Sequence, residues 1–268
     1  MIAGWRCAVC GTTVDIAEPA PWRCPLATAD DPYHVLHLLD VGPAEAPGGL
    51  GVDDAAATDL NPFVTYGPRL AWWAFARSHG MTAAACEALT LEVVGDARFT
   101  PFTRSVALSD ELSEVVGTNV WVKDETGNIA GSHKARHLAS ILLHLRAAET
   151  LGLLAERRPL AIASCGNAAL AAATLAARVE WPLDVYVPTW MDDAFGARLD
   201  ALGARIHRCE RRATDPPGDP AMHRFREASD EGAIPFTVQG PENASCLDGG
   251  RTLGWEIADQ AAAAGVEL

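Results

Sequence analysis

The residues with the clearest chemical potential lie in the run from Asn128 to Arg136, which contains Lys134. The chain has 19 arginines but only two lysines, Lys123 and Lys134. A primary amine can lose its proton and form a Schiff base with a carbonyl group, whereas a guanidinium stays protonated. Two interpretations of Lys134 follow, imine chemistry or a solvated lysine at the start of a helix.

A second candidate is the turn Ser164-Cys165-Gly166-Asn167, which follows a short apolar run and precedes an alanine-rich one. A glycine lets the backbone approach a ligand closely, and the free N–H groups at a helix start favour an anion such as a carboxylate. Asn167 can both donate and accept a hydrogen bond to a ligand, or it can simply cap the helix. Both interpretations are open on the residues alone.

The elements that must position these residues alternate between strand and helix from about residue 100 onward. The expected strands are 119–123, 159–163, 183–187, 204–208 and 236–238, and the expected helices are 132–148, 167–179, 193–202, 223–231 and 252–264. Strands separated by helices predict right-handed βαβ units and a mostly parallel sheet. Ligands on such sheets bind at the carboxyl ends of strands, where both candidate turns fall.

Composition excludes several classes of function. The net charge of −14 argues against nucleic acid as a partner, because little basic surface offsets phosphate repulsion. The sequence contains no run of 18 apolar residues, so we expect no membrane span, and the N-terminus has no signal-peptide pattern. The seven cysteines are an odd number and mostly scattered, which favours a reducing, cytoplasmic location.

Several segments resemble, in the same order, motifs of the β-family (fold type II) of pyridoxal-phosphate enzymes. These segments are 99–102, 122–125, 131–134, 164–167, 188–191, 201–204 and 248–257. The resemblance covers roughly residues 98–260 and is strongest to the threonine synthase and threonine dehydratase subgroup. It implies an α/β fold with mostly parallel, doubly wound sheets in two subdomains, and pyridoxal 5'-phosphate as cofactor.

The resemblance implies a role for three residues toward the cofactor. Lys134 would hold the cofactor aldehyde as a Schiff base and then act as general base on the substrate α-proton, which requires a neutral amine. Asn167 would hydrogen-bond the cofactor's ring oxygen. His133 would lie near the cofactor phosphate, as in tryptophan synthase β, or else be a helix-start histidine that makes no cofactor contact.

The resemblance also implies a substrate site, in which Ser164, Gly166 and Ala168 cradle the carboxylate of a small amino acid. The expected activity is a threonine synthase-like lyase reaction, by elimination or replacement on a hydroxy- or phospho-amino acid. A threonine/serine dehydratase is the alternative, and a non-catalytic amino-acid-binding homologue is the alternative of another class. The full-length protein is expected to be a homodimer.

The family's glycine-rich loop for the cofactor phosphate is expected after the segment 248–257, and the printed chain ends at Leu268, where the next strand should begin. We therefore expect a C-terminally truncated chain. The alternatives are a second chain that supplies the remainder and a homologue that no longer binds cofactor.

The N-terminal segment resembles the zinc-ribbon-like start of one threonine synthase subgroup. Its three cysteines are Cys7, Cys10 and Cys24. A structural zinc ion takes four ligands, usually from two Cys-x-x-Cys pairs, and Ala27 stands where the fourth cysteine is expected. His34 or His37 is available to complete the set. We expect a degenerate ribbon that folds without metal, with zinc as the less favoured alternative.

Three parts follow from these patterns. Residues 1–40 form the degenerate ribbon-like segment, and residues 41–97 form a linker and helices, with a Gly/Pro-rich loop over 42–62. Residues 98–268 form the N-terminal and central part of the cofactor-dependent catalytic domain.

Overall fold

The structure is a computed structural model of the chain. It describes residues 2–28, 30–40, 61–95, 102–104, 114–117 and 120–266. The loop expected over 42–62 lies outside these residues except for its last two positions, and so do residues 99–101 of the Thr-Pro segment and Asn119.

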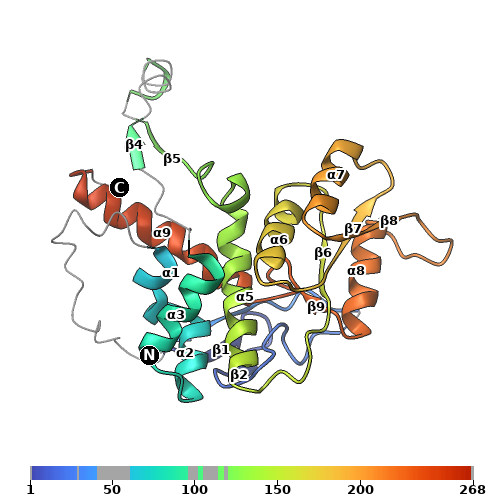
Figure 1. The fold of residues 1–268 in the computed structure, drawn as a ribbon, viewed down its shortest axis with the longest axis horizontal. Coiled ribbons are helices and arrows are strands. Elements are labelled where there is room, and N and C mark those ends of the chain that lie inside the picture. Colours follow the sequence, from blue (N-terminus) through green and yellow to red (C-terminus); the bar gives the residue numbers. More distant parts are fainter. Residues whose placement is uncertain are drawn as a thin grey trace.

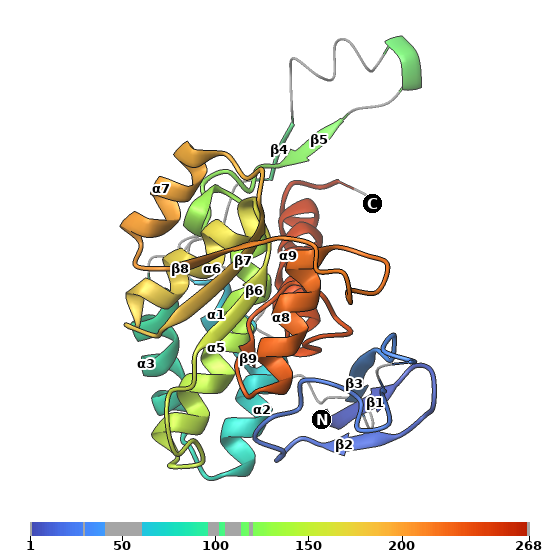
Figure 2. The same cartoon turned by 90° about the vertical axis from the view of Figure 1, so that its right-hand side faces the viewer.

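A four-stranded parallel sheet forms one half of the molecule. Its strands are β6 (Leu160–Ala163), β7 (Leu183–Pro188), β8 (Arg205–Cys209) and β9 (Ile234–Pro235), in the order β8-β7-β6-β9. Its helices are α6 (Asn167–Arg178), α7 (Asp193–Ala201) and α8 (Pro220–Asp230). Figure 2 shows α6 and α7 on one face of the sheet and α8 on the other. The predicted α/β fold with parallel βαβ units is confirmed.

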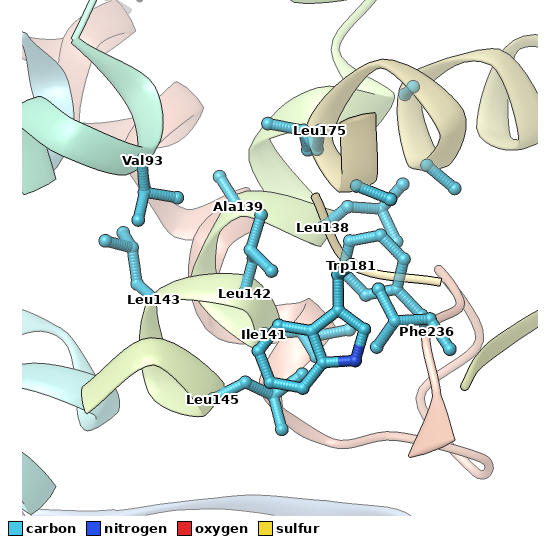
Figure 3. Packing of buried hydrophobic residues seen from close by; sticks show 14 of the residues in the cluster. Val93, Leu138, Ala139, Ile141, Leu142, Leu143, Leu145, Leu175, Trp181 and Phe236 are labelled. Atoms are coloured by element: carbon cyan, nitrogen blue, oxygen red, sulfur yellow. The ribbon is translucent and has the colours of Figure 1, made fainter. Parts of the chain in front are cut away.

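The helix α5 (Lys134–Thr150) is the centre of the main core and packs against helices on several sides. These neighbours are α2 (Ala71–Ser78), α3 (Ala83–Val94), α6 and α9 (Ser245–Ala263). Leu138, Ile141, Leu142 and Leu145 of α5 are fully buried, and Figure 3 shows them beside Trp181 and other apolar side chains. Each such side chain contributes about 1.5–3 kcal/mol by leaving water. Because α5 is buried around most of its circumference, with Arg136, Ser140 and His144 buried beside the leucines, it is fixed firmly in the interior.

The helix α9 crosses α5 closely, and two glycines make the approach possible. A Cβ atom on Gly249 would lie 2.1 Å from the carbonyl oxygen of Arg136, and one on Gly250 would lie 2.5 Å from Cε1 of His137. The predicted start of this helix at residue 252 is wrong, because the helix begins seven residues earlier, at Ser245. The Gly-Gly pair resembles a turn in the sequence but lies inside a helix at a tight crossing.

Other boundaries also differ from the prediction. The last strand is Ile234–Pro235 instead of 236–238, although the Phe236 N–H still donates to the Ala161 carbonyl at 2.8 Å. The helix predicted from residue 223 begins at Pro220, where the Asp219 side chain caps the N–H of Ala221. Ser132 is not the N-cap of α5, because His133 occupies that position.

The N-terminal segment forms a separate antiparallel sheet in the order β2-β1-β3. Its strands are β1 (Ile2–Cys7), β2 (Thr13–Asp15) and β3 (Leu36–Asp40). Its small core contains Trp5 and Leu36 and reaches Ala244 just before α9. The Ala244 N–H also donates to the Trp22 carbonyl at 2.9 Å, so this segment is tied to the start of α9. Trp22 itself is half-buried, with its ring edge against His144.

Two short elements lead to α5, and a first helix precedes α2. The strands β4 (Phe102–Arg104) and β5 (Trp121–Lys123) pair antiparallel. The helix α1 is Pro62–Thr65, η2 is Gly67–Arg69, and η3 is Ile129–Gly131. Within the described residues, no helix is both long and apolar enough to cross a membrane.

Candidate active site

The loop that delivers Lys134 to α5 is held in an unusual backbone conformation. Ala130 has φ 58° and ψ 19°, and the next residue, Gly131, has φ 70°. A left-handed conformation at a residue with a Cβ atom costs roughly 1–2 kcal/mol. The N–H of Gly131 donates to the Asn128 carbonyl at 2.8 Å, which closes the turn. The loop therefore contains a strained residue, Ala130, shortly before Lys134.

Lys134 is the first residue of α5 and is half-exposed. Its side-chain amine makes no hydrogen bond or ion pair with any of the described residues. Burial lowers the pKa of the adjacent His133, and the positive charge of Lys134 lowers it further. The ring of His133 is in edge contact with the ring of His137, at 5.8 Å between ring centroids.

The other lysine, Lys123, lies in a buried ion network. Its amine is 3.3 Å from the carboxylate of Glu256, and the two side chains are 6% and 0% exposed. Arg136 also pairs with Glu256, and its Nε lies 2.7 Å from the carboxylate of Glu125. Burial raises the pKa of Glu256 and lowers that of Lys123, and the opposite charges counteract both shifts.

This network positions the lysine loop and was not foreseen from the sequence. It joins Glu125 at the beginning of the loop, Arg136 two residues after Lys134, and Glu256 on α9. The sequence does show opposite charges within or beside apolar elements. It does not show which of them pair, because Arg136 and Glu256 are 120 positions apart. The network ties the loop to both α5 and α9.

The turn before α6 has the form of an anion site. Gly166 is the N-cap in an extended conformation, and no side chain caps the helix. Asn167 is the first helical residue and its side chain is exposed, so the alternative in which it caps α6 is wrong. A Cβ atom on Gly166 would meet nothing within 4 Å. The first N–H groups of a helix lack partners inside it, so they can bind an anion in this open space.

Ser164 and Ala168 flank this turn. The Ser164 hydroxyl lies 3.4 Å from the N–H of Gly166, and Ser164 lines a cavity of about 600 Å³. Tyr186 at the end of β7 and Pro220 at the start of α8 are also on its wall. The cavity therefore lies at the carboxyl edge of the parallel sheet, where ligands of such sheets bind. Ala168 is buried in the first turn of α6.

The two candidate turns are neighbours. The 3-10 helix η3, which immediately precedes the Ser132-His133-Lys134 run, contacts α6. Figure 1 shows α5 and α6 side by side, with both helices beginning toward the same end of the molecule. Lys134, Gly166 and Asn167 do not line the 600 Å³ cavity; Ser164 and Cys165 do.

The structure also brings together the N-terminal cysteines. The ligand atoms of Cys7, Cys10, Cys24 and His34 all lie within 4.8 Å of one another. His37 is not part of this group: it is exposed, and its Nδ1 lies 3.3 Å from the carbonyl of Leu38.

Known proteins match this chain in family and in fold. Residues 95–266 match the model of the family described as "Pyridoxal-phosphate dependent enzyme". No curated protein gave a significant match. A pyridoxal 5'-phosphate-dependent aspartate racemase is 20% identical, with a TM-score of 0.51, over 67% of this chain and 51% of the racemase.

A second solved structure is the diaminopropionate ammonia lyase from Escherichia coli in complex with D-serine. It is 17% identical, with a TM-score of 0.52, over 68% of this chain and 50% of the lyase. At these identities the likeness concerns the fold, and the chain spans about half the length of the structures it matches. The family match covers well over half of the chain, so the protein belongs to the family of pyridoxal-phosphate dependent enzymes.

Proposed function

We propose that this chain is the lysine-bearing part of a pyridoxal-phosphate lyase that acts by elimination or replacement on a small hydroxy- or phospho-amino acid, in the manner of threonine synthase. The observation that carries the proposal is the contrast between the two lysines. Lys123 is committed to a buried ion pair, whereas the amine of Lys134 has no partner among the described residues. An unpaired primary amine at a helix start, beside an open anion site, supports covalent attachment of an aldehyde.

The residues fit the cofactor on three observations. The amine of Lys134 is available, the amide of Asn167 is exposed and makes no capping bond, and the space beside Gly166 is open. Lys134 would hold the cofactor covalently, Asn167 would bond its ring oxygen, and His133 would lie toward its phosphate. When bound, the cofactor supplies the electron sink that stabilises negative charge at the substrate α-carbon.

The chain's own residues then perform binding and proton transfer. The N–H groups of Gly166 and Ala168 and the hydroxyl of Ser164 would hold the substrate carboxylate at the positive end of α6. The amine of Lys134 would take the proton from the substrate α-carbon. The ion network would help to keep the lysine in place for this role, since Arg136 cannot move without breaking its pairs with Glu125 and Glu256.

The cofactor phosphate is the part of the site for which the described residues offer no glycine-rich loop. The one adjacent glycine pair in the described part of the chain is Gly249-Gly250. It lies at the contact between α5 and α9, where no space is left for a phosphate group. This observation motivates the alternative of a non-catalytic homologue that binds an amino acid. The two proposals differ in whether Lys134 forms a covalent adduct.

The test uses the same substitution at both lysines. The purified chain is mixed with pyridoxal phosphate, and the visible absorption of lysine-bound cofactor is recorded. We expect the band in the parent protein and in Lys123→Arg, which keeps the charge opposite Glu256, and its loss in Lys134→Arg, because a guanidinium cannot form the adduct. The same mixture is made with the full-length protein, and a full-length parent without the band would favour the non-catalytic alternative.

The reaction is assigned by product analysis on the same preparation. Release of a 2-oxo acid from threonine or serine would assign a dehydratase, which is the second candidate. Formation of threonine from phosphohomoserine would assign threonine synthase-like chemistry. Two segments resemble the threonine synthase subgroup, namely the Cys-bearing N-terminal segment and the turn Lys123-Asp124-Glu125. They support the formation of threonine as the expected result.

A further inference from the structure

The group formed by Cys7, Cys10, Cys24 and His34 lies far outside the candidate active site. We propose that these four residues bind one structural zinc ion, with three thiolates and one imidazole as ligands. The four ligand atoms come from three separate parts of the N-terminal segment and all lie within 4.8 Å of one another. Such convergence needs a cause, because thiols and an imidazole do not attract one another strongly without a metal.

The distances fit a tetrahedral site. With Zn–S bonds near 2.3 Å and Zn–N bonds near 2.05 Å, ligand sulfurs are separated by about 3.8 Å, and sulfur and nitrogen by about 3.6 Å. The Sγ atoms of Cys10 and Cys24 are 3.5 Å apart, and Sγ of Cys7 lies 3.5 Å from Nδ1 of His34. Two of the ligand pairs therefore already have the spacing that zinc requires.

The imidazole is oriented as a zinc ligand would be. Nδ1 of His34 faces Cys7, while Nε2 lies 3.1 Å from a carboxylate oxygen of Asp31. A carboxylate on the second ring nitrogen fixes the tautomer and raises the basicity of a metal-bound histidine. The backbone of Asp31 is held in place, because its N–H donates to the Thr28 hydroxyl at 3.1 Å and its carbonyl accepts from the N–H of Thr28 at 3.2 Å.

The first cysteine pair has the form of a metal-binding turn. The N–H of Val9 points at the sulfur of Cys7 at 3.4 Å, and the N–H of Gly11, at φ +75°, donates to the Cys7 carbonyl at 3.0 Å. Amide donors stabilise a thiolate, and the glycine permits the tight left-handed turn. Cys10 is exposed, which gives an ion access from solvent, while the other three ligands are buried.

A metal would also answer a structural need of the segment. The small core around β1 has six buried members, and two of them are the ligands Cys7 and Cys24. Short sheets with so little apolar surface are usually stabilised by a metal or a disulfide. A disulfide could join only two of the three cysteines and would leave the third cysteine and His34 unexplained. In place of the missing cysteine at Ala27, His34 supplies the fourth ligand.

The site is tested by metal content and by cobalt substitution on the whole chain purified under reducing conditions. We expect about one zinc per chain by mass spectrometry of metals. With cobalt in place of zinc, we expect thiolate charge-transfer absorption together with the visible bands of a tetrahedral ion.

Matched variants assign the ligands. His34→Asn and Cys10→Ser should each weaken cobalt binding by at least about tenfold, whereas His37→Asn should leave it unchanged. Cys10 is exposed, so its replacement removes a ligand without opening the core. A reduced protein that takes up neither zinc nor cobalt would overturn the proposal, and so would equal losses in His34→Asn and His37→Asn. A Cys10–Cys24 disulfide in protein that binds no metal would also overturn it.

Discussion

The first residue of α5 and the residues that follow it have opposite surroundings. Lys134 is half-buried and its amine has no partner among the described residues, whereas Arg136 two positions later is buried with carboxylates on two sides. The strained Ala130 precedes the first turn, and close-packed leucines follow it. A firmly packed helix therefore begins with one amine that has no partner among the described residues.

The same contrast separates the two lysines and shows why residue type alone is a weak guide. Lys123 and Lys134 are the two lysines of the chain, and composition does not separate them. Their surroundings do, because Lys123 is in a buried ion pair and the amine of Lys134 has no partner among the described residues.

The largest effect is expected from the ion network. Glu256→Gln leaves Lys123 and Arg136 buried with one carboxylate fewer, and we expect a loss of about 3–5 kcal/mol in the free energy of unfolding, measured in urea. The control is Asp193→Asn, which removes a surface ion pair with Arg208. The Asp193 side chain is 96% exposed, so we expect its replacement to lower the free energy of unfolding by less than about 1 kcal/mol. Equal losses of unfolding free energy in the two variants would show that the buried ion network is no more important to stability than a surface ion pair.

The contact between α5 and α9 gives the next effect. In Gly249→Ala the new methyl group meets the carbonyl oxygen of Arg136, and because this is backbone, α9 must shift, at a cost of about 2–3 kcal/mol. Gly254 lies on the same helix with nothing within 4 Å of its Cβ position, so Gly254→Ala should instead stabilise by up to about 1 kcal/mol. Thermal unfolding of both variants measures the difference. Destabilisation by both would show that α9 is sensitive throughout and not at the crossing alone.

A third prediction concerns acid. His144 in the body of α5 is fully buried, and burial lowers its pKa to about 4, with Nε2 donating to the Pro19 carbonyl at 2.9 Å. The unfolded state, with an ordinary pKa near 6.5, binds the proton first, so this histidine contributes stability above about pH 6.5 that is lost as pH falls toward 4.

Replacement by glutamine isolates this contribution. We expect His144→Gln to flatten the dependence of the unfolding free energy on pH between about 6.5 and 4, by about 2 kcal/mol over the window. The control is the same replacement at the exposed His37. An unchanged slope in His144→Gln would mean that the helix body is more open to protons than its packing indicates.

The smallest effect on stability is expected at the open end of α6. Asn167→Ala removes an exposed side chain that makes no capping bond, so the free energy of unfolding should change by less than about 0.5 kcal/mol. The affinity for pyridoxal phosphate, measured by titration, should fall by about tenfold if the amide bonds the cofactor ring.

A second asparagine provides the matched comparison. Asn61 caps α1, accepts from the Phe63 N–H at 2.9 Å and donates to the Val94 carbonyl at 2.6 Å. Asn61→Ala should cost about 1–2 kcal/mol of stability and leave cofactor affinity unchanged. The reverse pattern, with stability lost at Asn167 and affinity lost at Asn61, would contradict the assigned site.

Much of the fold could be predicted because its signals are local. Apolar runs and helical periodicity placed α6 and α7 and the strands β6 to β8 within two residues of their observed bounds. The start of α9 could not be predicted, because Gly249-Gly250 reads as a turn unless the facing Arg136 and His137 are known. The Asp219-Pro220 start of α8 was a local signal that the prediction overlooked.

The candidate site was reached mainly through ordered motifs, and its supporting residues were not. Glu125, Arg136 and Glu256 meet only after the chain has folded, so a single sequence gives no reason to pair them. The proposed zinc ligands show the same limit: spacing identified the three cysteines, but only the structure distinguishes His34 from His37. Contacts between distant segments decide these cases, and periodicity does not report them.

The most direct test of the central claim is to identify which lysine carries the cofactor. The full-length protein is incubated with pyridoxal phosphate, reduced with borohydride to make the attachment permanent, digested, and its peptides are weighed by mass spectrometry. We predict that the cofactor mass is found on Lys134 and not on Lys123. A label on Lys123, equal labelling of both lysines, or no label on Lys134 would contradict the account.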